Sequence, residues 1–454
     1  MQRIALLFLA LAILPTAGCG DNDDQGPWDP IATGGCGLAE YHWLRPGEVG
    51  ELVSHEGGSP SSPSSLDVLV AALTGAFSPL PYGARMYKVR YTTQDKGQPV
   101  EATGMIVLPW LQEDVVGPVP LVLLLHGTSG VTNKCAPSIG DSTYTALAFL
   151  LASQGFAVAA PDFIGLDATG SWDGRPTVTH AYLGIEQTAV GSLDLVRATH
   201  RFFEEVVTDP IELTDELIVW GVSQGGHGVL AVDLVAPYYA PELPILAGVA
   251  MVPATDLLAV GRFATREKHW ISAAFAAMVT SLHHWYEGTA SDGAVFTDTA
   301  PGLIASTLPV ELYETCELGD LLEDATSIEG AYQSDFVDAL QTDDQDAFAP
   351  WSCYLRENSI RTAPFPRLTD TPIFYVIGEL DDTINTPDQQ AEFTALCADG
   401  YRLDYLECAD ADHGDAAAWS LPEQVAWAKD RLAGVPLSAS VCQSAAPMRC
   451  VGQE

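Results

Sequence analysis

The chain has 454 residues, 47% of them hydrophobic, so it is long and apolar enough to bury one large core. It carries 60 acidic and 20 basic residues, for a formal net charge of −40. Such a surface repels nucleic acid and anionic membrane faces, and we expect neither as a partner. We interpret the acidity as a means of staying soluble in an extracellular or salty setting, in preference to an acid-specific function.

The first 19 residues have the pattern of an export signal. Arg3 supplies a positive charge, and residues 4–14 form an apolar run that is too short to span a bilayer. Residues 16–19 (TAGC) resemble the lipobox of bacterial lipoproteins, in which the cysteine, here Cys19, becomes lipidated; Thr16 departs from the leucine that this pattern prefers. We expect an outer-membrane or cell-surface lipoprotein held by a lipid anchor. A plain secretory signal, which gives a secreted or periplasmic protein, is the alternative.

Two polar segments bound the predicted globular part of the chain. Residues 20–65 combine an acidic start with the low-complexity run GGSPSSPSS, and they predict a tether. Residues 434–454 are expected to form a C-terminal tail. Between them we expect a core built from residues 66–255 and 366–433, interrupted by an insertion over residues 256–365.

Strand and helix patterns alternate along the predicted core. Residues 87–93 and 102–108 alternate apolar and polar side chains, as exposed antiparallel strands do. Continuous apolar runs typical of buried parallel strands occupy residues 119–125, 156–161, 217–221, 245–251 and 373–377, and helical patterns occupy residues 143–153, 183–205 and 225–235. This alternation predicts an α/β fold with a mostly parallel, doubly wound sheet.

The alternation stops in the insertion, where helical periodicity continues without a buried-strand pattern. Ile271, Phe275, Met278, Leu282 and Trp285 step by four and three residues and share one face of a predicted helix. The insertion would lie over the carboxyl ends of the strands, where such sheets bind ligands. We therefore expect a helical cap in which Phe275 and Met278 contact the substrate. A structural subdomain packed elsewhere is the alternative.

A G-x-S-x-G motif supplies the candidate nucleophile. Residues 221–225 (GVSQG) lie between an apolar strand pattern and a helical pattern. A sharp strand–turn–helix of this kind needs small residues around the serine, and it exposes the hydroxyl of Ser223 at the amino end of a helix. A turn serine that merely caps the helix is the alternative.

A serine hydroxyl needs a base that takes its proton and an acid that orients this base. In α/β folds that carry this motif, the chain order is serine, acid, histidine. His413 is the only histidine after His284, and it follows an apparent final strand at residues 402–406. The strand that ends at residue 378 is followed by ELDD, in which Asp381 has the common G-x-x-D spacing and Glu379 and Asp382 are the alternatives. We predict a catalytic triad of Ser223, Asp381 and His413.

The reaction also needs N–H donors for a tetrahedral oxyanion. One donor should be the backbone N–H of Gln224, directly after the nucleophile. The loop at residues 126–130 (HGTSG) follows a buried strand and contains small residues, so we expect the N–H of Thr128 to be the second donor. An ordinary turn at the end of a strand is the alternative reading of this loop.

Several blocks together resemble the secretory lipase family. They are residues 126–130 (HGTSG) and 135–138 (CAPS), residues 160–166 (APDFIGL) and 180–183 (HAYL), residues 221–226 (GVSQGG), and residues 378–381 (GELD). The likeness covers residues 66–433. It implies an α/β-hydrolase core, a helical cap inserted before the acid residue, and activity on esters and acylglycerols without a metal or other cofactor. The cap and residues 434–454 match no block, so no acyl chain length is implied.

The nine cysteines are consistent with an exported protein. If Cys19 is lipidated, an even set of eight remains, which in an oxidising compartment predicts four disulfides. Pairing of neighbours (397 with 408, 442 with 450, 316 with 353 and 36 with 135) is one of about a hundred connectivities. Free buried thiols are the alternative. The sequence contains neither a C-x-x-C pair nor an H-E-x-x-H motif, so we expect no metal site.

Taken together, these patterns predict an exported serine hydrolase that cleaves carboxylic esters, with an ester or lipid as its substrate. Two alternatives stay open. They are a peptidase or amidase on the same fold, because the triad does not distinguish ester from amide, and a surface lipoprotein that binds without catalysis.

Overall fold

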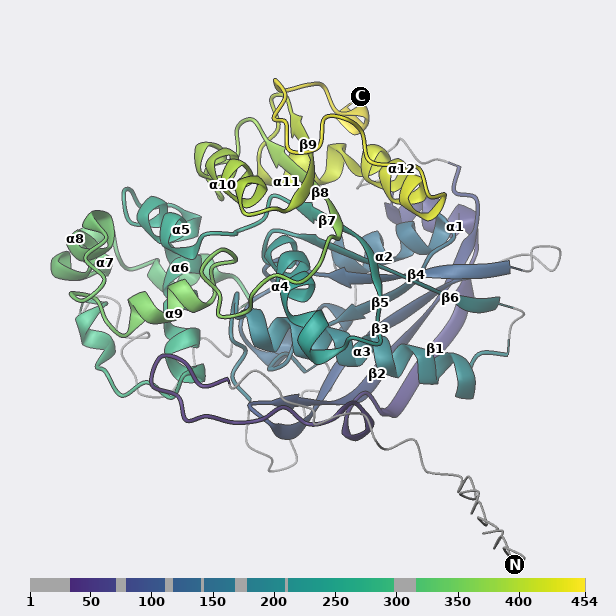
Figure 1. Ribbon diagram of the computed structural model, residues 1–454, viewed down its shortest axis with the longest axis horizontal. Coiled ribbons are helices and arrows are strands. Elements are labelled where there is room, and N and C mark those ends of the chain that lie inside the picture. Colours follow the sequence, from purple (N-terminus) through teal and green to yellow (C-terminus); the bar gives the residue numbers. More distant parts are fainter. Residues whose placement is uncertain are drawn as a thin grey trace, which may run out of the picture.

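The computed structural model describes residues 33–70, 79–110, 117–139, 143–167, 178–208, 211–297 and 316–453. Nine strands form one sheet in the order β1-β2-β3-β5-β4-β6-β7-β8-β9 (Figure 1). The pairings from β1 through β3 to β5 are antiparallel, and the five pairings from β5-β4 to β8-β9 are parallel. The expected mostly parallel sheet is therefore confirmed.

The strands are β1 (Leu52–Ser61), β2 (Gly83–Asp95), β3 (Gln98–Trp110), β4 (Gly117–Leu125), β5 (Ala157–Pro161), β6 (Ile211–Val222), β7 (Ile245–Met251), β8 (Pro372–Gly378) and β9 (Arg402–Cys408). The helices are α1 (Pro63–Val70), α2 (Thr143–Ser153), α3 (Ile185–Glu205), α4 (Gln224–Tyr239), α5 (Leu257–Ala264), α6 (Trp270–Trp285), α7 (Ile328–Ala331), α8 (Ser334–Thr342), α9 (Trp351–Glu357), α10 (Thr386–Ala398), α11 (His413–Trp419) and α12 (Leu421–Leu432).

The central parallel strands of the sheet are buried on both faces, and their sequences are correspondingly apolar. In β4, Leu121 and Leu123 belong to a core cluster with α3, α4 and α10, whereas Val122 and Leu124 belong to a second cluster with α1, α2, α11 and α12. Successive side chains of a strand point to opposite faces, so a strand covered on both sides needs an uninterrupted apolar run. This is why β4 lacks the alternation that β2 shows.

Helices α5 to α9 occupy the insertion between β7 and β8 and have a hydrophobic cluster of their own. Figure 1 shows them gathered beyond one end of the sheet. The stripe predicted from the sequence lies on α6, and its five side chains are all buried in this cluster. The aromatic rings of Tyr332 and Phe336 lie within 6.1 and 6.4 Å of the ring of Phe275. Most of the stripe is thus the core of the insertion itself.

The tether predicted over residues 20–65 is wrong from residue 33 onward. Residues 52–61 form β1, an edge strand that pairs antiparallel with β2. Its register shifts between Gly57 and Pro60, and a Cβ on Gly57 would lie 2.7 Å from the Met86 oxygen. The glycine–proline run is therefore a bulge at a sheet edge, where both residue types are tolerated. Most side chains of β1 are exposed, so the strand lacks the apolar alternation by which sequence reasoning finds strands.

The eight described cysteines form four disulfides, Cys36–Cys353, Cys135–Cys316, Cys397–Cys442 and Cys408–Cys450. Pairing of sequence neighbours, one of the connectivities left open by the sequence, does not occur, and the expected four disulfides are present. Cys397 precedes β9 and Cys408 ends it, so the length of the strand, roughly 20 Å, separates them. A disulfide requires Cα atoms closer than about 7 Å. The segment after residue 434 instead folds back along β9 and pairs with both.

The predicted export signal and Cys19 lie outside the described residues. Within the described ranges, no helix combines the length and the apolar character needed to cross a bilayer.

Candidate active site

Ser223 lies in the turn between β6 and α4 with φ 57° and ψ −113°. This backbone conformation is strained for a residue that carries a side chain. It is held because the chain passes very close to itself: a Cβ on Gly221 would lie 2.1 Å from the Gly225 oxygen, and one on Gly225 would lie 2.0 Å from the Leu125 oxygen. Both glycines of the motif are thus required by the turn. The hydroxyl of Ser223 is presented beside the amino end of a 16-residue helix.

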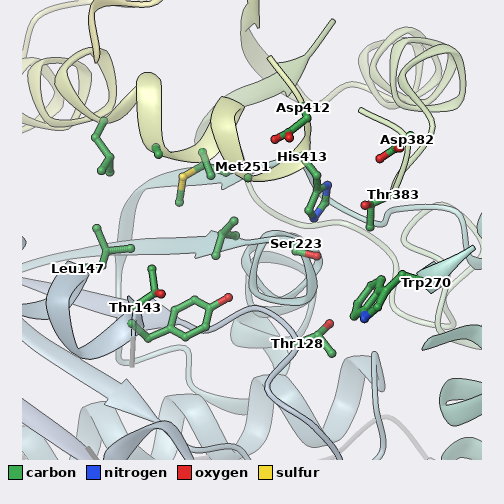
Figure 2. Close-up of a pocket in the computed structure, with 16 residues that line it drawn as sticks. Thr128, Thr143, Leu147, Ser223, Met251, Trp270, Asp382, Thr383, Asp412 and His413 are labelled. Carbon is green, nitrogen blue, oxygen red and sulfur yellow. The ribbon is translucent and has the colours of Figure 1, made fainter. Parts of the chain in front are cut away.

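His413 and Asp381 are brought together by the loops that follow β9 and β8. The Nδ1 atom of His413 lies 2.8 Å from Oδ2 of Asp381. The carboxylate is fully buried, and the imidazole is 19% exposed. Because a carboxylate accepts, Nδ1 carries the proton, and Nε2 is left to accept one. Figure 2 shows the imidazole directed toward Ser223, and both residues line the same pocket.

The Asp381 carboxylate is fixed by three further donors. Its Oδ1 accepts from the backbone N–H groups of Thr383 and Ile384, at 3.0 and 2.9 Å. Its Oδ2 also accepts from Nε2 of Gln389, at 2.9 Å. Sequence reasoning missed Gln389, which lies on α10 eight residues after the aspartate and belongs to no motif. Asp382, the alternative acid, is exposed and lines the pocket, and it is Asp381 that contacts His413.

The two expected oxyanion donors are both close to Ser223, Gln224 in sequence and Thr128 in the same pocket lining. Gln224 is the first residue of α4, so its N–H has no intrahelical carbonyl to bond. Thr128 follows β4 and lines the pocket with Ser223, and its hydroxyl is 2.6 Å from that of Tyr182. A Cβ on Gly127 would lie 2.1 Å from the Tyr144 hydroxyl, so this loop also needs a glycine. The role of Gln224 and Thr128 as oxyanion donors stays a prediction.

Neutral buried histidines support this loop and the helix start. The ring nitrogens of His126 contact the carbonyl oxygens of Gly127 and Asp162, at 2.6 and 3.2 Å. Burial lowers the pKa of His126 to about 4. The Nε2 atom of His180 lies 3.0 Å from the side-chain nitrogen of Gln224, and burial lowers the pKa of His180 to about 3. Both rings are thus uncharged at neutral pH and hold the loop and the start of α4 in place through hydrogen bonds.

The pocket over Ser223 has a volume of about 510 Å³, within the range of small-molecule sites. Apolar side chains from α2, β7 and α12, among them Leu147, Met251 and Leu421, line part of it. A second cavity beside Ser223 is lined by Phe275 and Met278 but measures only about 10 Å³. The two cap residues singled out from the sequence therefore lie next to the nucleophile, yet the room for a ligand lies elsewhere.

Metal-ligand atoms gather at one place in the described part of the chain, formed by Cys36, Cys353 and Glu357. The two sulfur atoms there are bonded to each other, which leaves a single carboxylate as a ligand. The group cannot hold a metal ion in this state.

Residues 140–294 match the model of the secretory lipase family. The resemblance to the secretory lipases is confirmed. No curated protein sequence matches the chain significantly. Among solved structures, the chain is similar to the rice cell wall degrading esterase LipA of Xanthomonas oryzae, with 18% identity, a TM-score of 0.65 and coverage of 85% of this chain and 99% of that one. A Legionella pneumophila protein has 18% identity and a TM-score of 0.66 over 86% of this chain and 100% of its own.

Candida antarctica lipase A is similar as well, with 15% identity and a TM-score of 0.61 over 88% of this chain and 85% of its own. These likenesses establish the α/β-hydrolase fold. With the family match, they support an ester hydrolase on this fold, and the family match and the four disulfides support export.

Proposed function

We propose that this protein is an exported serine hydrolase that cleaves carboxylic esters, acylglycerols among them, through an acyl-enzyme. The observation that carries the proposal is the convergence of three segments: a strained turn presents Ser223 in a pocket where His413 faces it, and Asp381 holds His413 from behind at 2.8 Å. The family match and the lipase and esterase folds support the same reaction class.

The reaction proceeds in two steps on these side chains. Nε2 of His413 takes the proton from Ser223 as its Oγ attacks the ester carbonyl carbon. The tetrahedral oxyanion accepts hydrogen bonds from the N–H groups of Gln224 and Thr128. His413 then donates the proton to the departing alcohol oxygen, which leaves an acyl group on Ser223. Water, deprotonated by His413, attacks that acyl group and releases the acid.

Asp381 has a defined part in both steps. Its carboxylate stabilises the imidazolium that forms transiently and holds Nδ1 as the protonated nitrogen. Four hydrogen bonds keep this carboxylate in place, so it does not reorganise as the charge on His413 changes.

The acyl chain is assigned to the apolar part of the 510 Å³ pocket, beside Leu147 and Met251. This replaces the expectation that Phe275 and Met278 on the cap contact the chain, because the cavity they line holds only about 10 Å³.

Purified protein should release p-nitrophenol from acetate, butyrate and longer p-nitrophenyl esters, while leaving an aminoacyl p-nitroanilide intact. Ser223→Ala should lose activity by several orders of magnitude and keep its fold. Preferential turnover of the anilide would make the protein an amidase or peptidase. A folded wild-type protein without turnover of any of these compounds would make it a binding protein.

Cys19 is proposed as the lipid anchor that holds the enzyme at the outer membrane. Several acyl chains on one cysteine bind a bilayer firmly, whereas one chain binds only marginally. Cys19→Ala should move the enzyme from the membrane to the soluble fraction. A mature wild-type N-terminus other than Cys19 would contradict the anchor and leave a secreted or periplasmic enzyme.

A further inference from the structure

The pocket over Ser223 has two unlike halves. Leu147, Met251 and Thr143 lie on one side of the Ser223–His413 pair, and Asp382, Thr383 and Trp270 lie on the other (Figure 2). An ester bound at Ser223 must send its acyl chain to one half and its alcohol to the other. The first half is the more apolar and suits the acyl chain, so the second receives the alcohol.

The alcohol half carries negative charge. Asp382 is exposed and lies in this half, and Asp412, which is also exposed, lines the pocket on the other side of His413 (Figure 2). One oxygen of Asp412 accepts from the N–H of Asp415 as a helix cap, at 2.8 Å, which leaves its charge in place. None of the described residues that line the pocket is lysine or arginine, and Lys268 of the nearby cap donates to the Leu322 and Ala325 carbonyls instead. Among the described residues, the pocket thus offers carboxylates without a lysine or arginine in its lining.

An aromatic face adds to this charge. Trp270 is the first residue of α6, and its side chain is 44% exposed although most of that helix is buried. Tryptophan is the best aromatic partner for an organic cation, and quaternary ammonium groups are commonly bound by such rings. A carboxylate and an indole on the same side of the nucleophile are the features that attract a bulky, poorly hydrated cation.

We propose that the alcohol half of the pocket selects esters of cationic alcohols, with a quaternary ammonium group held between Trp270 and Asp382. The inference rests on the proposed ester hydrolysis and adds the class of alcohol. One such contact at a water-exposed site changes a rate constant roughly two- to fivefold, so the two together predict a preference of about tenfold.

The test compares two esters of the same acid and nearly the same shape, butyrylcholine and 3,3-dimethylbutyl butyrate, in which carbon replaces the charged nitrogen. Each kcat/KM is divided by the rate constant for hydroxide hydrolysis of that ester, which removes the intrinsic difference in reactivity. The normalised ratio should be about ten at roughly 0.02 M salt and should fall severalfold at about 1 M salt, because the attraction is screened.

Variants locate the effect. Asp382→Asn and Trp270→Leu should each lower the normalised ratio about two- to fivefold. Asp335→Asn is the matched control, because Asp335 is an exposed aspartate on α8 outside the pocket lining, and it should leave the ratio unchanged. A wild-type ratio of one or less would overturn the inference, as would equal effects of Asp382→Asn and Asp335→Asn. Hydrolysis of neither ester would overturn the proposed function and this inference with it.

Discussion

The disulfide Cys408–Cys450 anchors the loop that carries His413. Cys408 is the last residue of β9, five positions before the histidine, and its side chain is fully buried. The C-terminal segment lies against the end of β9, because the Ala409 N–H donates to the Met448 carbonyl at 2.8 Å and the Met448 N–H donates to the Glu407 carbonyl at 2.9 Å. Removing the disulfide should therefore free the segment that positions the proposed base.

Cys397–Cys442 provides a matched control on the same C-terminal segment. The two disulfides close loops of nearly the same size, with sequence separations of 42 and 45 residues. The loop-entropy relation gives each a contribution of about 4 kcal/mol to the free energy of unfolding, so the two double alanine variants should lose similar stability. They should differ in activity, because Cys397 lies at the end of α10, away from His413. A displacement of about 1 Å can reduce a rate 100-fold, and we expect a loss of about tenfold in kcat/KM for Cys408→Ala with Cys450→Ala.

The assay combines urea unfolding with turnover of p-nitrophenyl butyrate, measured well below the midpoint temperature of both variants. Similar losses in the free energy of unfolding, together with an activity loss confined to the Cys408–Cys450 variant, would support the anchoring role. Equal activities in the two folded variants would refute it, because the disulfide would then act on stability alone.

Three further predictions follow from the site and the core. Asp381→Asn should lower kcat by roughly four orders of magnitude, since it leaves the wrong imidazole tautomer, and Asp382→Asn should cause a far smaller loss; reversed losses would assign the acid role to Asp382. Leu147→Trp should fill the pocket and lower kcat/KM for long-chain esters more than for acetate esters. Phe275→Ser should instead cost about 3–5 kcal/mol of stability and should affect esters of all chain lengths alike. The reverse pattern in a chain-length profile would place the acyl site at the cap. Burial raises the pKa of Asp162 to about 6, so between about pH 3.8 and pH 6 the folded protein keeps a proton that the unfolded chain releases, and the stability this group contributes falls as pH rises through that window. In urea unfolding, the loss of stability caused by Asp162→Asn should therefore be larger at pH 4 than at pH 7 by on the order of 2–3 kcal/mol. Equal losses at the two pH values would contradict the raised pKa.

Local patterns in the sequence were sufficient to find the sheet and the elbow. The continuous apolar runs form β4 to β8, because a strand covered on both faces must be apolar at every position. The glycines on either side of Ser223 are required because a Cβ at either position would lie about 2 Å from a backbone oxygen. His413 could be predicted because the fold leaves one place for the base. Asp381 could be preferred over Asp382 only by its spacing, and the hydrogen bond to His413 now separates them.

The features that were missed or mispredicted depend on contacts between segments distant in the sequence. β1 is an exposed edge strand without apolar alternation, so only its pairing with β2 reveals it. The disulfides depend on how the C-terminal segment returns along β9, which no spacing indicates. Gln389 lies one turn into α10, and only the fold brings it within hydrogen-bonding distance of the Asp381 carboxylate. The apolar stripe on α6 was recognised, but periodicity does not tell a ligand groove from the core of an insertion.

Labelling with diethyl p-nitrophenyl phosphate is the most direct test of Ser223 as the nucleophile. We expect one equivalent of p-nitrophenol, one diethylphosphoryl group on the peptide that contains Ser223, complete loss of esterase activity, and no labelling of folded His413→Ala on the same time scale. Loss of activity with the phosphoryl group on another residue, or full activity with Ser223 labelled, would contradict it.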